Sequence, residues 1–153
     1  MTPSNDGDDL RDLYQEMILD HNRNPRNFGP LDGANRQAEG FNPLCGDRIT
    51  VYLHLENDVI EDIRFQGSGC AISRASASIM TKVLKGKSVP EARELFQEFH
   101  AMVTQADAGS PSERKLEVLA GVRKYPVRVK CATLAWHTFN SSLKDEKQVV
   151  STE

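Results

Sequence analysis

Apolar residues recur at helical spacing near the start of the chain. They occupy positions i, i+3, i+4, i+7 and i+8, which is the stripe of an amphipathic helix: Leu10, Leu13, Tyr14, Met17 and Ile18. This helix should end before Asn24 and Pro25, because the residue before a proline is pushed out of helical conformations. His21, close to that end, is predicted to be a solvated side chain at a helix C-terminus rather than a catalytic histidine.

Alternation of apolar and polar residues replaces the helical pattern over about 48–66. It predicts an antiparallel hairpin with one apolar face. Asn57 and Asp58 suit the turn of this hairpin because both residue types tolerate positive φ. A weaker pattern over residues 35–41 predicts a strand before the hairpin, so the chain should form three strands in total.

Helical spacing returns after the hairpin. One helix should open at Cys70 and end at Gly86, and a capping box at residues 88–91 should begin the next. A second capping box at residues 110–113, with proline at the first helical position, predicts a short helix. Residues 127–143 have the spacing of the last helix.

The predicted fold class is therefore α+β, with a small antiparallel three-stranded sheet packed against about five helices. The absence of an internal repeat or a composition break predicts a single domain over residues 1–153. The polar ends of the chain, residues 1–8 and 144–153, are predicted to be disordered.

Composition narrows the classes of function. A net charge of −3 gives no overall basic field that would attract nucleic acid. No apolar run approaches the roughly 20 residues that span a membrane, and the polar, acidic first residues do not resemble a secretory or transit peptide. We therefore expect a cytoplasmic protein that binds neither nucleic acid nor membrane.

Three cysteines and one aspartate carry the candidate chemistry: Cys45, Asp47, Cys70 and Cys131. Three cysteines cannot all pair in disulfides, so they are metal ligands, nucleophiles or inert core thiols. Each cysteine lies where a loop leads into a predicted strand or helix, whereas inert core thiols should fall inside apolar stripes. Three thiolates and a carboxylate suit a tetrahedral zinc site. Because the chain has no Cys-x-x-Cys pair, spacing alone leaves the metal site and the inert core both open.

Four segments, which occur in order across roughly residues 9–143, form a recognisable set: residues 20–27, 42–49, 67–78 and 125–136. They resemble the SufU family, the zinc-containing branch of the IscU/NifU N-terminal-like superfamily of iron–sulfur cluster assembly proteins. Two features indicate this branch. Lys130 stands where IscU-type scaffolds have a histidine, and residues 86–124 form the insertion typical of SufU-type proteins.

The resemblance implies a zinc-dependent sulfurtransferase. Its Zn²⁺ ligands would be Cys45, Asp47, Cys70 and Cys131, and Cys45 would also accept sulfur. The implied partners are a SufS-type, pyridoxal-phosphate-dependent cysteine desulfurase, which supplies persulfide sulfur, and downstream iron–sulfur assembly proteins. Arg128 matches a family arginine that contributes to docking and activity, although from the sequence alone it could equally be a surface charge.

Two other functions remain open at this point. The same cysteines could hold a transient iron–sulfur cluster, which would make the protein an assembly scaffold. Alternatively, the zinc could be purely structural and could only hold partners together. A site with a carboxylate in the fourth place is unusual for a structural zinc, where Cys or His normally fills all four positions.

Overall fold

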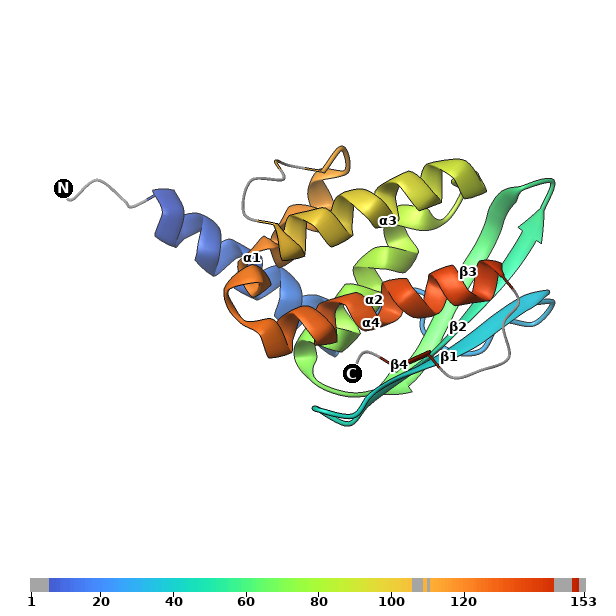
Figure 1. Cartoon of the computed structure of the whole chain (residues 1–153), viewed down its shortest axis with the longest axis horizontal. Coiled ribbons are helices and arrows are strands. Elements are labelled where there is room, and N and C mark those ends of the chain that lie inside the picture. The colour runs from blue at the N-terminus through green and yellow to red at the C-terminus, as the bar shows by residue number, and fades with distance from the viewer. Residues whose placement is uncertain (1–5, 106–108, 110, 145–149, 152–153) are drawn as a thin grey trace.

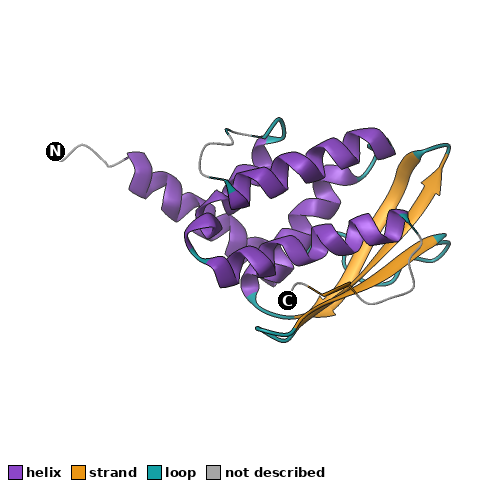
Figure 2. Ribbon diagram, viewed as in Figure 1, coloured by secondary structure: helices purple, strands orange, loops and turns teal. Residues whose placement is uncertain are grey.

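A sheet with helices over one of its faces organises the chain (Figure 1 and Figure 2). The computed structural model describes residues 6–105, 109, 111–144 and 150–151. Strands β1 (Arg36–Asn42), β2 (Asp47–Glu56) and β3 (Val59–Ser68) pair antiparallel in the order β3-β2-β1. Asn57 and Asp58 form the β2–β3 turn with φ of 52° and 65°, which confirms the predicted hairpin.

Regular structure extends close to both ends of the described chain. Helix α1 (Asp6–Arg23) includes residues 6–8, and β4 (Val150–Ser151) pairs in parallel with β1. Residues 1–5, 145–149 and 152–153 lie outside the described part, so the expected disorder of the two tails stays a prediction. Backbone pairing at the free edge of β1 explains β4, because an unpaired edge offers N–H and C=O groups to an extended segment.

Helix α2 (Ala71–Leu84) is the central helix, with α1 and α4 packed against it. Cys70 caps its N-terminus, as the sequence predicts. Small side chains permit close approach on several sides, and ten of its residues are buried, among them Ser76 and Ser78. The Ser76 hydroxyl donates to the carbonyl oxygen of Ala132 at 2.6 Å, which ties α2 to the last helix close to Cys131.

Helix α3 (Val89–Thr104) begins with the predicted capping box, in which Ser88 and Glu91 bond reciprocally. The second predicted box depends on Ser110, which lies outside the described residues. The short helix that should follow it starts later than predicted: η1 (Arg114–Lys124), a run of 3-10 turns, is capped by Glu113. Ser112, which precedes it, bonds to the Glu98 carboxylate of α3.

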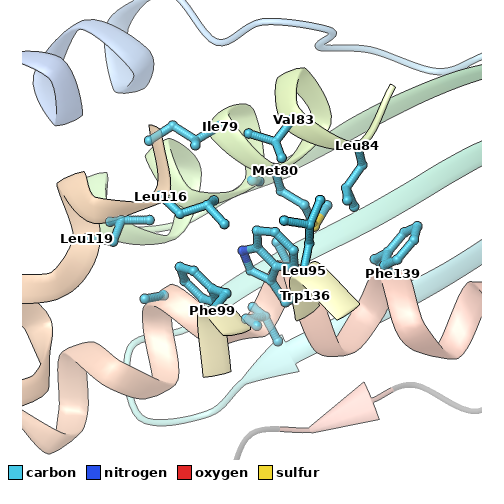
Figure 3. Packing of buried hydrophobic residues seen from close by; sticks show 14 of the residues in the cluster. Ile79, Met80, Val83, Leu84, Leu95, Phe99, Leu116, Leu119, Trp136 and Phe139 are labelled. Atoms are coloured by element: carbon cyan, nitrogen blue, oxygen red, sulfur yellow. The ribbon is translucent and has the colours of Figure 1, made fainter. Parts of the chain in front are cut away.

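Helix α4 (Pro126–Leu143) lies against the sheet and completes the core. Trp136 is fully buried and stacks on Phe99 of α3, with ring centroids 4.6 Å apart (Figure 3). Gly40 of β1 permits the contact with the sheet, because a Cβ there would lie 2.0 Å from Oγ1 of Thr138. This close contact sets where the first turns of α4 meet the β1–β2 turn. None of the helices in the described ranges is long and apolar enough to cross a membrane.

His21 is buried between α1 and α2 rather than solvated, so that expectation is wrong. Its Nδ1 lies 2.7 Å from the hydroxyl oxygen of Ser78, which also accepts the backbone N–H of Arg26 at 2.8 Å. Burial, together with the nearby positive charges of Arg26 and Lys82, lowers the pKa of His21 from 6.5 to about 4, against a smaller opposite effect of Asp20. The neutral imidazole therefore belongs to the folded state.

Stability should consequently fall as pH is lowered from 6.5 to about 4, because in this window the unfolded chain binds a proton that folded His21 does not. The loss should reach at most about 1.4 kcal/mol of unfolding free energy per pH unit. Urea unfolding at several pH values measures it. His21→Gln should flatten the dependence, whereas His54→Gln, at a more exposed site, should not. Equal slopes for wild type and His21→Gln would contradict the assignment.

Candidate metal centre

Cys45 lies in the short turn between β1 and β2. Asn42 and Asp47 close this turn as the last paired residues of the two strands, and Gly46 donates its backbone N–H to the carbonyl oxygen of Asn42 at 2.8 Å. Gly46 has φ of +73°, in the left-handed region that favours glycine. The turn leaves the Cys45 side chain exposed.

Cys70 stands at the junction of β3 and α2. Its sulfur accepts the backbone N–H of Ser73 at 3.5 Å, so it caps the helix. Cys70 is partly buried.

Cys131 projects from the second turn of α4 and is buried. Burial raises the pKa of its thiol, and the hydrogen bond with Cys45 and the nearby Cys70 and Asp47 raise it further. Burial and these neighbouring groups all disfavour a negative charge on the Cys131 sulfur. A cation between the same groups would reverse the preference, because a bound metal deprotonates a coordinating thiol.

The three segments converge at one end of the sheet, where the β1–β2 turn, the β3–α2 junction and the start of α4 come together (Figure 1). One donor atom from each of Cys45, Asp47 and Cys131 lies within 4.8 Å of the other two. The sulfurs of Cys131 and Cys45 are 3.4 Å apart. Cys70 is outside this mutual group of three but adjacent to it, with its sulfur 4.0 Å from Oδ2 of Asp47.

Asp47 is fully buried, and both of its carboxylate oxygens receive hydrogen bonds. The backbone N–H of Cys70 donates to Oδ1 at 2.8 Å, and Nδ2 of Asn42 donates to Oδ2 at 3.2 Å. Gly69 allows this approach, since a Cβ at that residue would lie 2.4 Å from Oδ1. The carboxylate is therefore held in one orientation, toward the sulfurs.

This donor set fits zinc. Three sulfurs and one carboxylate oxygen have the number and softness of ligands that Zn²⁺ takes in tetrahedral sites. The hydrogen bonds to Asp47 are of the kind that orient metal ligands from behind. A divalent cation would also offset the negative charge gathered at this buried junction.

Arg128 does not belong to the donor group in the structure. It lies in the first turn of α4, exposed, with its guanidinium stacked 4.5 Å from the centroid of the Tyr125 ring. Three large apolar side chains are also exposed near the cysteines in sequence: Leu44, Tyr125 and Val127. Leu44 precedes Cys45, and the other two stand at the start of the helix that carries Cys131.

Asn42 is the site residue that the sequence reasoning did not single out. It contacts two of the donors, with Nδ2 at 3.2 Å from Asp47 and 3.5 Å from the sulfur of Cys131. The signal was present in the strand pattern. Ala38, Gly40 and Asn42 alternate on the buried face of β1, and the last of them is polar.

Comparisons with known proteins agree with this picture. Residues 13–146 match the family described as NifU-like N terminal domain. The zinc-dependent sulfurtransferase SufU of Bacillus subtilis is 40% identical over 90% of this chain and 94% of its own length. The iron-sulfur cluster assembly scaffold protein IscU of Streptococcus pyogenes is 42% identical over 88% of this chain and 85% of its own length.

Solved structures share the fold. A putative iron-sulfur cluster assembly scaffold protein for the SUF system from Fervidobacterium islandicum superposes with a TM-score of 0.74 at 33% identity, covering 84% of this chain and 94% of that one. A NifU-like N-terminal protein from Brucella abortus gives a TM-score of 0.80 at 25% identity, covering 89% and 95%. By sequence and by fold, the chain belongs to the NifU-like N-terminal domain family, within the IscU/NifU superfamily of iron–sulfur cluster assembly proteins.

Proposed function

We propose that this protein is a zinc-dependent sulfurtransferase, which accepts persulfide sulfur from a SufS-type cysteine desulfurase on Cys45 and passes it to iron–sulfur cluster assembly proteins. The observation that carries the proposal is the convergence of three thiols and a buried carboxylate with a single exposed sulfur, that of Cys45. The name of the Bacillus relative supports it.

Cys45, Asp47, Cys70 and Cys131 would hold the zinc. When bound, zinc supplies positive charge that keeps the coordinating thiols deprotonated. The chain itself contributes the fixed carboxylate, the burial of Cys131 and the exposed turn that carries Cys45. Its fold would gain stability from the metal, because the four donors come from the sheet and from two helices.

Sulfur transfer is then a thiol–persulfide exchange at Cys45. The Cys45 thiolate attacks the terminal sulfur of the donor persulfide, a new S–S bond forms, and the bond between the two donor sulfurs breaks. The donor cysteine leaves as a thiolate, and Cys45 carries the persulfide. Exposure of Cys45 meets the main geometric demand of this step, since the attacking sulfur must reach a sulfur on another protein.

Exposed side chains beside Cys45 in the sequence and at the start of the helix that carries Cys131 suit a protein partner. Leu44, Tyr125 and Val127 expose 57%, 50% and 50% of their surfaces, and exposed aromatic and aliphatic side chains of this kind mark contact surfaces. Arg128 adds a cation stacked on Tyr125. We assign these four residues to docking of the desulfurase, with Arg128 as a docking residue rather than a chemical one.

Assembly of an iron–sulfur cluster on the same cysteines is the second candidate, because the Streptococcus relative is named as a scaffold at similar identity. Lys130 favours the sulfurtransferase. It stands beside Cys131, at the position where IscU-type scaffolds have a histidine, and its ammonium group cannot serve as a metal ligand.

Purified protein should contain stoichiometric zinc, lack a visible chromophore and raise the turnover of a SufS-type desulfurase. Cys45→Ala should abolish this stimulation because it removes the attacking sulfur. Elemental analysis and a sulfide-release assay measure both, and thermal unfolding verifies that the variant is folded. Iron with acid-labile sulfide and no effect on turnover would favour the scaffold instead. Full stimulation by folded Cys45→Ala would exclude Cys45 as the acceptor.

Gly69→Ala should weaken zinc binding, because the added Cβ would overlap Oδ1 of Asp47 and lie 3.0 Å from its Cβ. Displacing one ligand should lower affinity by about ten-fold or more, in the range seen when ligand orientation is lost. Competition with a chromophoric chelator measures the affinity. Gly121→Ala is the control, since its Cβ would meet no atom within 4 Å. Wild-type affinity in Gly69→Ala would argue against Asp47 as a ligand.

A further inference from the structure

Asn42 is a buried amide that contacts the candidate metal centre and the Cys45 turn together. Its Nδ2 lies 3.2 Å from Oδ2 of Asp47 and 3.5 Å from the sulfur of Cys131. Its Oδ1 accepts the backbone N–H of Leu44 at 3.2 Å, and its backbone carbonyl accepts that of Gly46 at 2.8 Å. One residue thus touches two donors and both sides of Cys45.

The contacts fix which way the amide points. A backbone N–H can only donate, so the atom that faces Leu44 must be the oxygen of the Asn42 side chain. The NH₂ group then faces Asp47 and Cys131, and its two hydrogens match the two acceptors. The reverse orientation would place donor against donor at Leu44 and oxygen against carboxylate at Asp47.

The four candidate metal ligands do not receive equal numbers of N–H hydrogen bonds. Asp47 receives one on each oxygen, from Cys70 and Asn42. The sulfur of Cys70 accepts a hydrogen bond from the backbone N–H of Ser73. The sulfur of Cys131 accepts one from Nδ2 of Asn42. Among the hydrogen bonds of the described residues, the sulfur of Cys45 takes part only in the one from the thiol of Cys131 and receives no N–H.

We propose that Asn42 is a positioning residue that holds Asp47 and Cys131 in place and thereby leaves Cys45 as the exchangeable ligand. This inference rests on the proposed zinc function. N–H donors that bond to anionic ligands both orient them and stabilise their charged form. A ligand without such a donor has less to lose when it leaves the metal, and Cys45 is also the exposed one.

The two ends of the Asn42 side chain can be tested separately. Asn42→Asp keeps the shape and an oxygen able to accept the Leu44 N–H, so the turn retains its support. It removes the NH₂ donor and puts a carboxylate oxygen beside Asp47 and Cys131. Asn35→Asp is the matched control. Asn35 precedes β1 at the other end of the strand and makes a similar pair of bonds, with the backbone of Leu55.

Two readouts distinguish positioning from general support of the fold. The first is zinc affinity by chelator competition, which we expect Asn42→Asp to lower by about ten- to a hundred-fold and Asn35→Asp to leave within about two-fold. The second is the rate of iodoacetamide labelling of each cysteine in the zinc-loaded protein, followed by peptide mass spectrometry. In wild type Cys45 should be labelled first. In Asn42→Asp the labelling of Cys131 should rise relative to that of Cys70.

Unchanged affinity and labelling order in Asn42→Asp would overturn the inference and leave the proposed function intact. An equal rise at all three cysteines would also overturn it, because general loosening of the fold exposes them alike. A wild-type protein that binds no zinc would remove the proposed function and this inference with it. If Asn42→Asp does not fold, Asn42→Ala is subjected to the same two readouts with the same criteria.

Discussion

The buried carboxylate of Asp47 is the constraint on which the candidate centre depends. Removing such a group from water costs several kcal/mol. Each hydrogen bond to a charged group contributes about 1.5–3 kcal/mol to stability. The bonds from Asn42 and Cys70 therefore offset much of the desolvation cost. These bonds connect the end of β1, the start of β2 and the N-terminus of α2. The carboxylate thus joins the segments that carry Cys45 and Cys70, and the contact of Gly40 with Thr138 brings in α4 with Cys131.

Much of the fold could be predicted from local patterns. The hairpin, the cap at Cys70 and the capping box at Ser88 follow from side-chain periodicity and backbone preferences, which act over a few residues. Distant contacts decide what the local patterns miss. His21 was expected to be solvated, but it is buried against Ser78, which is 57 residues away in the sequence. The short helix starts later than predicted, at Arg114, after Ser112 has bonded to Glu98 of α3.

The candidate centre, like the fold, has parts that the sequence could predict and parts that depend on tertiary contacts. Cysteine chemistry and chain position single out Cys45, Asp47, Cys70 and Cys131, but their convergence from three segments is a property of the tertiary structure. Asn42 was missed because an asparagine at the end of a strand usually reads as a turn residue. Its role follows only from contacts with Asp47 and with Cys131, which is 89 residues away in the sequence. Arg128 stacks on Tyr125 at the exposed start of α4, and its contribution to docking and activity stays a prediction.

The relatives carry both names, sulfurtransferase and scaffold, at similar identity, so the identity of the metal and of its ligands separates the two readings. X-ray absorption at the zinc edge of the purified protein separates these possibilities. A site formed by the three cysteines and Asp47 gives a single zinc environment with three sulfurs at about 2.3 Å and one oxygen at about 2.0–2.2 Å. Four sulfur neighbours, a shell of nitrogen and oxygen alone, or an absorption edge from iron in place of zinc would contradict it.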